Sequence, residues 1–264
     1  MATVARTAKS NLLIALTALT LSSCAQVVRT HVPAPIFMTG EAQGELLKGG
    51  FQLIQQGGTE GRLELEADSV QKELSLHNNV SPLTYGLDLG LFSRLDAYFR
   101  STSHESPGIL GGKFQILGAP KNQASAGNHA LAITMGAGSA SDNRKSDDIL
   151  DDDDDYDFEA DSSQSIFETS LIYSVRTSSS VVFYSSLRFI KNDLDVEITK
   201  SSDPDLEGQK ADIESNSKVF SLGGVFSSSG STELSVEASL QQTNWSKNDA
   251  TTFAFVNAAL GWRW

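Results

Sequence analysis

The sequence TFAFVNAALGWRW, residues 252–264, ends the chain and decides how the rest of it is interpreted. Alternate positions in this stretch are apolar and end in two tryptophans: Ala254, Val256, Ala258, Leu260, Trp262 and Trp264. The positions between them gain Asn257, Gly261 and Arg263 toward the terminus. Because successive side chains of a β-strand point to opposite faces, the stretch predicts a strand with one apolar and one partly polar face. A strand of about 9–11 residues with this alternation is what a membrane β-barrel requires.

The last residue is itself informative. An aromatic residue at the very C-terminus, here Trp264, resembles the closing-strand signal of bacterial outer-membrane β-barrel proteins. The resemblance implies a location in the bacterial outer membrane, with outer-membrane lipid as a partner. It also implies that barrel-insertion machinery binds the chain through the C-terminal strand.

The N-terminus has the order of a secretory signal peptide. Basic residues Arg6 and Lys9 precede an apolar stretch over residues 12–21 that is too short to span a bilayer, and small residues follow. The tetrad Leu21-Ser22-Ser23-Cys24 resembles a bacterial lipobox, which implies a lipid on Cys24. The alternative is an ordinary signal peptide cut near Ala25. We expect residues 1–23 to be a lipoprotein signal peptide and residues 24–38 to be a lipidated periplasmic tether.

Composition and charge exclude several classes of protein. The chain has 264 residues, is 39% hydrophobic and carries a formal net charge of −13. Its mature part has no run of 18 apolar residues, so a membrane-spanning helix is not expected there. So acidic a chain lacks the basic surface that nucleic-acid binding needs. Cys24 is the only cysteine, which excludes an internal disulfide and a cysteine-based metal site, and we expect no cofactor.

Alternation continues upstream of the C-terminal strand. Nine further segments show it: 232–244, 218–227, 181–190, 166–176, 129–138, 112–118, 95–101, 83–91 and 61–67. The fold class is therefore all-β, an antiparallel up-and-down transmembrane β-barrel of about ten strands over residues 39–264. Residues 39–56 either extend the first strand or add a hairpin, which would make twelve strands. The alternative for any single strand is a soluble β-sandwich, where the same alternation occurs.

The connections sort into short and long ones that alternate along the chain. The short ones are 92–94, 177–180 and 228–231, and the long ones are 68–82, 139–164 and 192–215. Short periplasmic turns and long extracellular loops are typical of outer-membrane barrels. Together with the lipobox and the aromatic terminus, this order favours the membrane barrel over the sandwich.

Charged residues occupy the face that the pattern turns inward. The predicted lumen charge network consists of Arg62, Glu64, Glu66, Asp88, Asp96, Arg100, Glu168, Arg176, Arg188, Glu237 and Arg263. Unpaired charges in a narrow lumen are costly, so pairing between arginines and carboxylates is expected. A barrel of this size is nearly filled by its own side chains. We therefore predict a largely plugged lumen, with a narrow path for ions or solutes as the alternative.

Two of the predicted loops are acidic. The first, residues 139–164, includes the weak cation-binding candidates Asp151, Asp152, Asp153, Asp154 and Asp155. Such a run repels itself and is expected to be extended or disordered, and its carboxylates suit calcium without the spacing of an EF-hand. The second, residues 192–215, contains Leu194, Val196 and Ile198, which favour a hairpin that projects above the membrane. An extracellular ligand or a divalent cation is thus a predicted partner, and a plain solvated surface is the alternative.

The sequence favours no catalytic function. His77 and His104 are the conceivable residues for a hydrolase at the outer rim, but no motif surrounds them. We therefore expect no enzyme, but an outer-membrane β-barrel lipoprotein with a structural or surface-interaction role. The alternatives are a narrow, porin-like passive channel and, second, an outer-rim hydrolase.

Overall fold

The structure is a computed structural model. It describes residues 25–55, 57–66, 69–80, 83–101, 107–145, 158–202, 204–228, 231–246 and 248–264. Every regular element in these ranges is a β-strand. Within the same ranges, no helix is long and apolar enough to cross a membrane.

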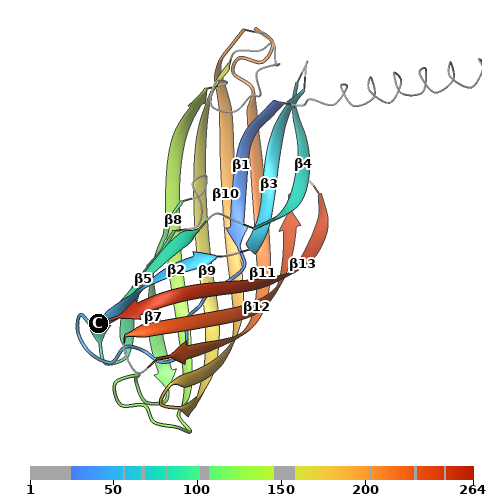
Figure 1. Ribbon diagram of the computed structural model, residues 1–264. Helices are drawn as coiled ribbons and strands as arrows, with labels where there is room; N and C mark the ends of the chain where they lie inside the picture. The colour runs from blue at the N-terminus through green and yellow to red at the C-terminus, as the bar shows by residue number, and fades with distance from the viewer. Residues whose placement is uncertain are drawn as a thin grey trace, which may run out of the picture.

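Ten of the strands in the described ranges close into a barrel, in the order β10-β11-β12-β13-β2-β5-β6-β7-β8-β9 (Figure 1). Their bounds are β2 Gly49–Gln55, β5 Thr84–Phe92, β6 Leu95–Arg100, β7 Ile109–Leu117, β8 His129–Lys145, β9 Phe158–Ser178, β10 Val181–Ser201, β11 Lys210–Ser227, β12 Thr232–Trp245 and β13 Asn248–Arg263. Each pair of neighbours is antiparallel. The predicted all-β, up-and-down architecture of ten strands is therefore confirmed.

The strand ends that the predicted short connections 92–94, 177–180 and 228–231 join lie at one end of the barrel, together with the C-terminus, whereas β12 and β13 are joined at the opposite end. Thr232 pairs with Trp262, and the main-chain N–H of Trp264 donates to the carbonyl oxygen of Gly49 at 3.3 Å. We call this the turn end. The longest strands, β9 and β10 with 21 residues each, extend far beyond the roughly ten residues that span a bilayer.

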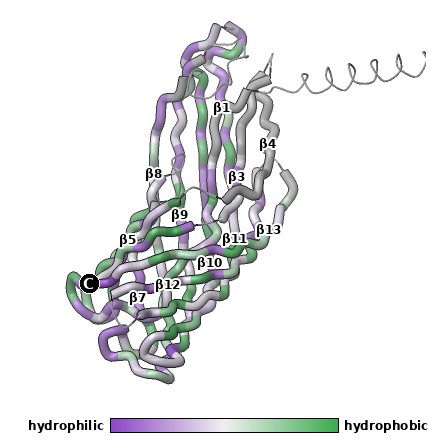
Figure 2. The backbone as a smooth tube through the Cα atoms, in the orientation of Figure 1, coloured by the Kyte–Doolittle hydropathy of each residue, from purple (hydrophilic) through white to green (hydrophobic). Residues whose placement is uncertain are grey.

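The barrel near the turn end is polar inside and apolar outside, the reverse of a soluble protein. On β12, Ser235, Glu237, Ser239 and Gln241 are buried, whereas Leu234 and Leu240 are about half exposed. The other barrel strands repeat this pattern, so large apolar side chains lie on the outer wall. Along the tube in Figure 2, hydrophobic and hydrophilic residues are interspersed on these strands. Alternation alone produces this arrangement, because the outer and inner sets occupy opposite faces of each strand.

The polarity of both faces inverts partway along the long strands. On β10 the outward side chains change from Leu187 and Phe189 to Lys191, Asp193 and Asp195, and the inward ones change from Ser186 and Arg188 to Leu194, Val196 and Ile198. On the neighbouring strands the outward side chains change from apolar to polar at nearly the same level. Phe167 of β9 pairs with Lys191, and Lys218 of β11 pairs with Phe189. We call this line the hydropathy border. Beyond it the strands have an apolar core and a charged exterior, as in a soluble sheet.

A second sheet lies beyond the border. It has three strands in the order β1-β3-β4, with bounds β1 Ala25–Pro33, β3 Gly57–Glu66 and β4 Ser69–Val80. Figure 1 shows it beside the long strands, away from the marked C-terminus. Val32 of β1 packs in one buried cluster with inward residues of the long strands, among them Leu194 and Ile213.

Between β1 and β2 the chain runs through the inside of the barrel. Residues 30–43, which we call the luminal segment, are almost entirely buried, and Val32, Ala34, Ile36, Phe37 and Ala42 are at most 3% exposed. The segment forms no regular structure after Pro33, so its main-chain groups need partners on the wall.

The structure corrects three expectations about the chain's course. Of the predicted strand 61–67, residues 61–66 belong to β3 of the small sheet and residue 67 lies outside the described residues, so the first barrel strand is β2. Alternation does not reveal which sheet a strand joins. Residues 25–38 form β1 and part of the luminal segment where a tether was expected, and the barrel wall starts at Gly49 rather than at residue 39. Within the described parts of the expected loops 139–164 and 192–215, residues 139–145, 158–164, 192–201 and 210–215 are extensions of β8, β9, β10 and β11.

Candidate functional site in the lumen

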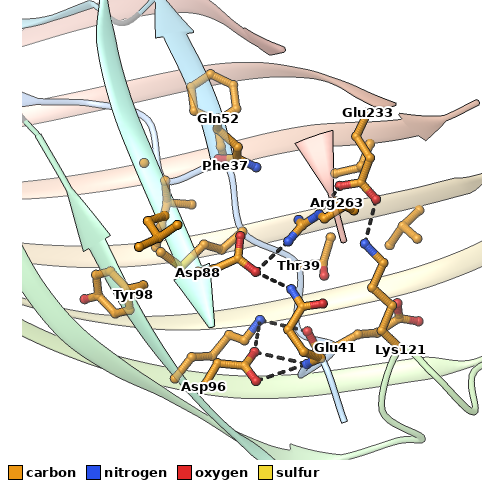
Figure 3. Close-up of a pocket in the computed structure, with 18 of the residues that line it drawn as sticks. Phe37, Thr39, Glu41, Gln52, Asp88, Asp96, Tyr98, Lys121, Glu233 and Arg263 are labelled. Carbon is orange, nitrogen blue, oxygen red and sulfur yellow. Dashed lines mark hydrogen bonds and ion pairs between the residues drawn. The ribbon is translucent and has the colours of Figure 1, made fainter. Parts of the chain in front are cut away.

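Three ion pairs close the turn end of the lumen. Arg263 of β13 binds Asp88 of β5 through Nη1 at 2.5 Å and Glu233 of β12 through Nε at 2.6 Å. Lys121, from the connection between β7 and β8, binds Glu233 at 2.6 Å. Figure 3 shows the four side chains converging, three from strands of the wall and Lys121 from the β7–β8 connection.

A second layer joins the wall to the luminal segment. Lys113 of β7 binds Asp96 of β6 at 3.0 Å, and it also donates to the main-chain oxygen of Glu41 at 2.8 Å. The main-chain N–H of Gln43 donates to both oxygens of Asp96, at 3.0 and 3.1 Å. The luminal segment thus completes the hydrogen bonding of a buried pair on the wall.

Glu41 is a carboxylate that the luminal segment itself contributes. Arg176 of β9 binds it with two nitrogens, and Asn128 donates to it at 2.9 Å. Glu41 and Arg176 are both buried. Such a two-pronged contact fixes the position of the segment as well as its charge.

The middle of the lumen contains a buried cluster of three charges. Glu168 of β9 lies 2.5 Å from Nη2 of Arg100 on β6 and 3.6 Å from Nη1 of Arg188 on β10, and the hydroxyl of Tyr98 donates to it at 3.0 Å. Both guanidinium groups also donate to the main-chain oxygen of Pro35, at 2.7 and 2.9 Å. One carboxylate therefore balances part of the charge of two arginines, and the luminal segment supplies a further acceptor for each of them.

Glu237 of β12 holds the opposite side of the luminal segment. Its carboxylate accepts hydrogen bonds from the main-chain N–H groups of Ile36 at 3.2 Å and Phe37 at 3.0 Å, and from the hydroxyl of Tyr184 at 2.7 Å. Glu237 is fully buried. The polar atoms of this buried carboxylate are thus matched by hydrogen-bond donors of the chain.

Neutral polar groups of the wall contact the luminal segment near and beyond the hydropathy border. Thr30 accepts hydrogen bonds from Gln164 at 2.6 Å and Asn192 at 3.0 Å, and the side chain of Gln241 donates to the main-chain oxygen of Val32 at 3.2 Å. Contacts between the luminal segment and the wall thus continue from the turn end to beyond the border.

His31 predicts a pH dependence for the small sheet. It is buried opposite Glu60 on the β1–β3 pair, and burial lowers its pKa from 6.5 to about 4, with Glu60 opposing the shift. Between these pH values the unfolded chain binds the proton and the folded chain does not, so stability falls as pH drops from 6.5 to 4, by about 3 kcal/mol. Hydrogen exchange of the β1 amides, corrected for intrinsic rates, should rise over this range. In His31→Asn the corrected rates should stay flat, and an equal rise in this variant would contradict the assignment.

The charges of the described lumen balance only when the luminal segment is included. The cations are Arg100, Lys113, Lys121, Arg176, Arg188 and Arg263, and the carboxylates of the wall are Asp88, Asp96, Glu168, Glu233 and Glu237. Glu41 supplies the sixth carboxylate. The cavity that remains near the turn end has a volume of about 40 Å³, room for a few water molecules at most.

Eight residues of the predicted network lie around this lumen: Asp88, Asp96, Arg100, Glu168, Arg176, Arg188, Glu237 and Arg263. Arg62, Glu64 and Glu66 do not, because β3 is not a strand of the wall, and their side chains lie outside the described residues. Cys24, the run Asp151 to Asp155, His104 and the side chain of His77 also lie outside them. Among the described residues, no group of His, Cys, Asp and Glu could hold a metal ion.

Sequence reasoning missed four charged members of the site: Glu41, Lys113, Lys121 and Glu233. Lys113 and Glu233 occupy inward positions of strands that the alternation identifies, so the same pattern could have found them. Lys121 lies in a turn and Glu41 in an irregular segment, where periodicity carries no signal.

Comparison with known proteins identifies no family for this chain. No protein-family model matches it, and no curated protein matches it. One solved structure that resembles it is the outer membrane protease OmpT from Escherichia coli, with 10% sequence identity and a TM-score of 0.42. The match covers 83% of this chain and 94% of that chain. A likeness of this strength assigns no activity to this chain.

The comparison nevertheless contradicts one expectation. The matched structure is that of an enzyme, whereas the sequence led to the prediction that the chain is not one. That prediction is not retained.

Proposed function

We propose that this chain is an outer-membrane β-barrel protein that presents a surface to its surroundings and whose lumen is closed by its own luminal segment. The observation that carries the proposal is the hydrogen-bonded course of residues 30–43 along the wall, with Glu41 completing the charge balance. A lumen filled in this way leaves no continuous aqueous path for solutes.

The outer wall supports the membrane location. Between the turn end and the hydropathy border the outward side chains are apolar, as with Phe183, Leu187, Leu222 and Leu260. A closed barrel has no free strand edge that could pair with another strand. Lipid acyl chains are therefore the partner that fits this apolar band. With short turns on the periplasmic side, the long strands and the small sheet would face outward from the cell.

The remaining partners follow from the sequence and stay proposals. The C-terminal strand β13 would engage the insertion machinery, and Cys24 would carry a lipid. The charged exterior of β10 and β11 beyond the border, with Asp193, Asp195, Glu197 and Asp212, would meet an extracellular ligand. A divalent cation stays a proposal for the run Asp151 to Asp155, which lies outside the described residues.

Planar-bilayer recording tests whether the lumen is closed. The full-length protein, refolded into lipid, should show no discrete openings in symmetrical potassium chloride. A protein that inserts, shows heat-modifiable gel migration and still conducts in reproducible unit steps would instead favour a narrow passive channel.

A charged residue introduced on the outer wall should show whether lipid or water surrounds it, because the charge costs free energy of unfolding only in lipid. Leu171 lies midway along the apolar band of β9, and Leu171→Arg should lower the free energy of unfolding in lipid by about 2–4 kcal/mol. Ser163 points outward from the same strand beyond the hydropathy border, so Ser163→Arg should change it by less than about 0.5 kcal/mol. Urea titration of both variants in vesicles gives the comparison. Similar small effects at the two positions would exclude a membrane around Leu171.

A further inference from the structure

The luminal segment enters the barrel at one end and leaves it at the other. At the turn end, the carbonyl oxygen of Ala42 accepts a hydrogen bond from the main-chain N–H of Lys121 at 2.8 Å. At the other end, Thr30 contacts Asn192, which follows the outward Lys191 beyond the hydropathy border. Between them the contacts rise along the wall in sequence order: Glu41 with Arg176, Ile36 with Glu237, Pro35 with Arg188 and Val32 with Gln241.

The wall binds this segment mainly through its main chain. Side chains of Asp96, Gln115, Ser174 and Glu237 accept from its N–H groups, at Gln43, Ala42, Gly40, Phe37 and Ile36. Side chains of Lys113, Arg100, Arg188 and Gln241 donate to its carbonyl oxygens, at Glu41, Pro35, Ala34 and Val32. The wall thus provides hydrogen-bond donors and acceptors for the main chain along the whole path of the segment. Together they form a binding site for one irregular, largely extended polypeptide.

The position of the N-terminal strand is fixed independently of these contacts. β1 pairs with β3 over the length of the strand, from Ala25–Leu65 to Pro33–Gly58. β3 in turn leaves the wall beside β13, where the N–H of Gly57 donates to Asn257 at 2.6 Å. The ladder therefore holds β1 beyond the border, opposite the C-terminus.

We propose that the barrel conducts its own N-terminal segment across the membrane, so that β1 is displayed on the same side as the long strands. This inference rests on the proposed function, because it requires the barrel to span a membrane. Cys24 is bonded to the first residue of β1. A lipid on that cysteine would thus lie at the outer surface, on the side opposite the periplasmic turns. It would anchor β1 there, which the barrel strands alone do not do.

Labelling of intact cells with a membrane-impermeant maleimide tests the proposal on the full chain. Val28→Cys and Arg29→Cys are consecutive on β1 and pair regularly with Leu63 and Arg62, so the two variants together sample both faces of the strand. Asn143→Cys, exposed near the end of β8, reports the long-strand side, and Asn122→Cys, exposed at the turn end, reports the other. The unsubstituted chain gives the background from Cys24. An epitope tag inserted between Cys24 and Ala25 provides a readout that does not depend on side-chain exposure.

One of the two β1 variants should label in intact cells to the same extent as Asn143→Cys, and antibody should bind the tag there. Asn122→Cys should label only after the cells are permeabilised. If Asn143→Cys labels in intact cells but β1 and the tag react only after permeabilisation, the proposal is overturned and the membrane barrel stands. If Asn122→Cys and Asn143→Cys are equally accessible, the barrel does not separate two compartments, and both the proposal and the proposed function fail.

Discussion

Replacing Glu168 by leucine is expected to lower the free energy of unfolding by about 3–5 kcal/mol, the usual cost of removing one partner from a buried ion pair. Glu168, Arg100 and Arg188 are each at most 2% exposed. Without the carboxylate, two guanidinium groups remain buried beside each other, and arginine does not relieve such a conflict by losing its proton. Urea unfolding of the refolded barrel, followed by tryptophan fluorescence, measures the loss.

An exposed pair in the same barrel provides the matched control. Lys210 and Glu197 join β11 and β10 at 2.8 Å, and their side chains are 70% and 45% exposed. Glu197→Leu removes a carboxylate from an ion pair just as Glu168→Leu does, but the pair is hydrated and its loss should cost less than about 1 kcal/mol. Equal losses in the two variants would show that burial does not determine the effect and that Glu168 has another role.

The wall of the barrel was predictable from the sequence because period-two alternation encodes it directly. The outward Leu234, Leu240 and Leu260 and the inward Arg188 and Glu237 all follow from counting in twos along their strands. Even the projection beyond the membrane left a signal. Leu194, Val196 and Ile198 interrupt an acidic stretch with the alternation of another strand segment.

The filling of the barrel was not predictable in the same way. The alternation of residues 61–67 is genuine, but it fits any half-buried sheet, and β3 joins the small sheet rather than the wall. Residues 34–43 show no periodicity because their main chain is satisfied by side chains far away in sequence, as with Ile36 and Glu237. The mixed charges of the inner face indicated pairing, but they did not reveal that a segment of the same chain supplies the carboxylate of Glu41.

Glu237 is the residue whose replacement best tests whether the luminal segment closes the lumen, because its carboxylate binds that segment from the wall. Glu237→Leu removes the acceptor for the N–H groups of Ile36 and Phe37 and for the hydroxyl of Tyr184, all within the interior. Each buried donor left without a partner costs about 1–3 kcal/mol, and water that enters to satisfy them must displace the segment. We therefore expect discrete conductance steps in planar bilayers that the unsubstituted chain lacks.

Ser221→Ala distinguishes loss of the segment from a general loosening of the wall. The hydroxyl of Ser221 on β11 shares a buried hydrogen bond with the hydroxyl of Ser239 on β12 at 3.0 Å. Ser239 lies two residues after Glu237, on the same face of β12. Removal of the Ser221 hydroxyl disturbs the same strand pair but leaves the acceptors of the luminal segment in place, so the variant should stay silent in bilayers. If Glu237→Leu folds, inserts and remains as silent as Ser221→Ala, then Glu237 does not hold the segment in the lumen. Openings in both variants would instead assign the closure to the β11–β12 wall and its Ser221–Ser239–Glu237 hydrogen bonds, and not to the acceptors of the luminal segment.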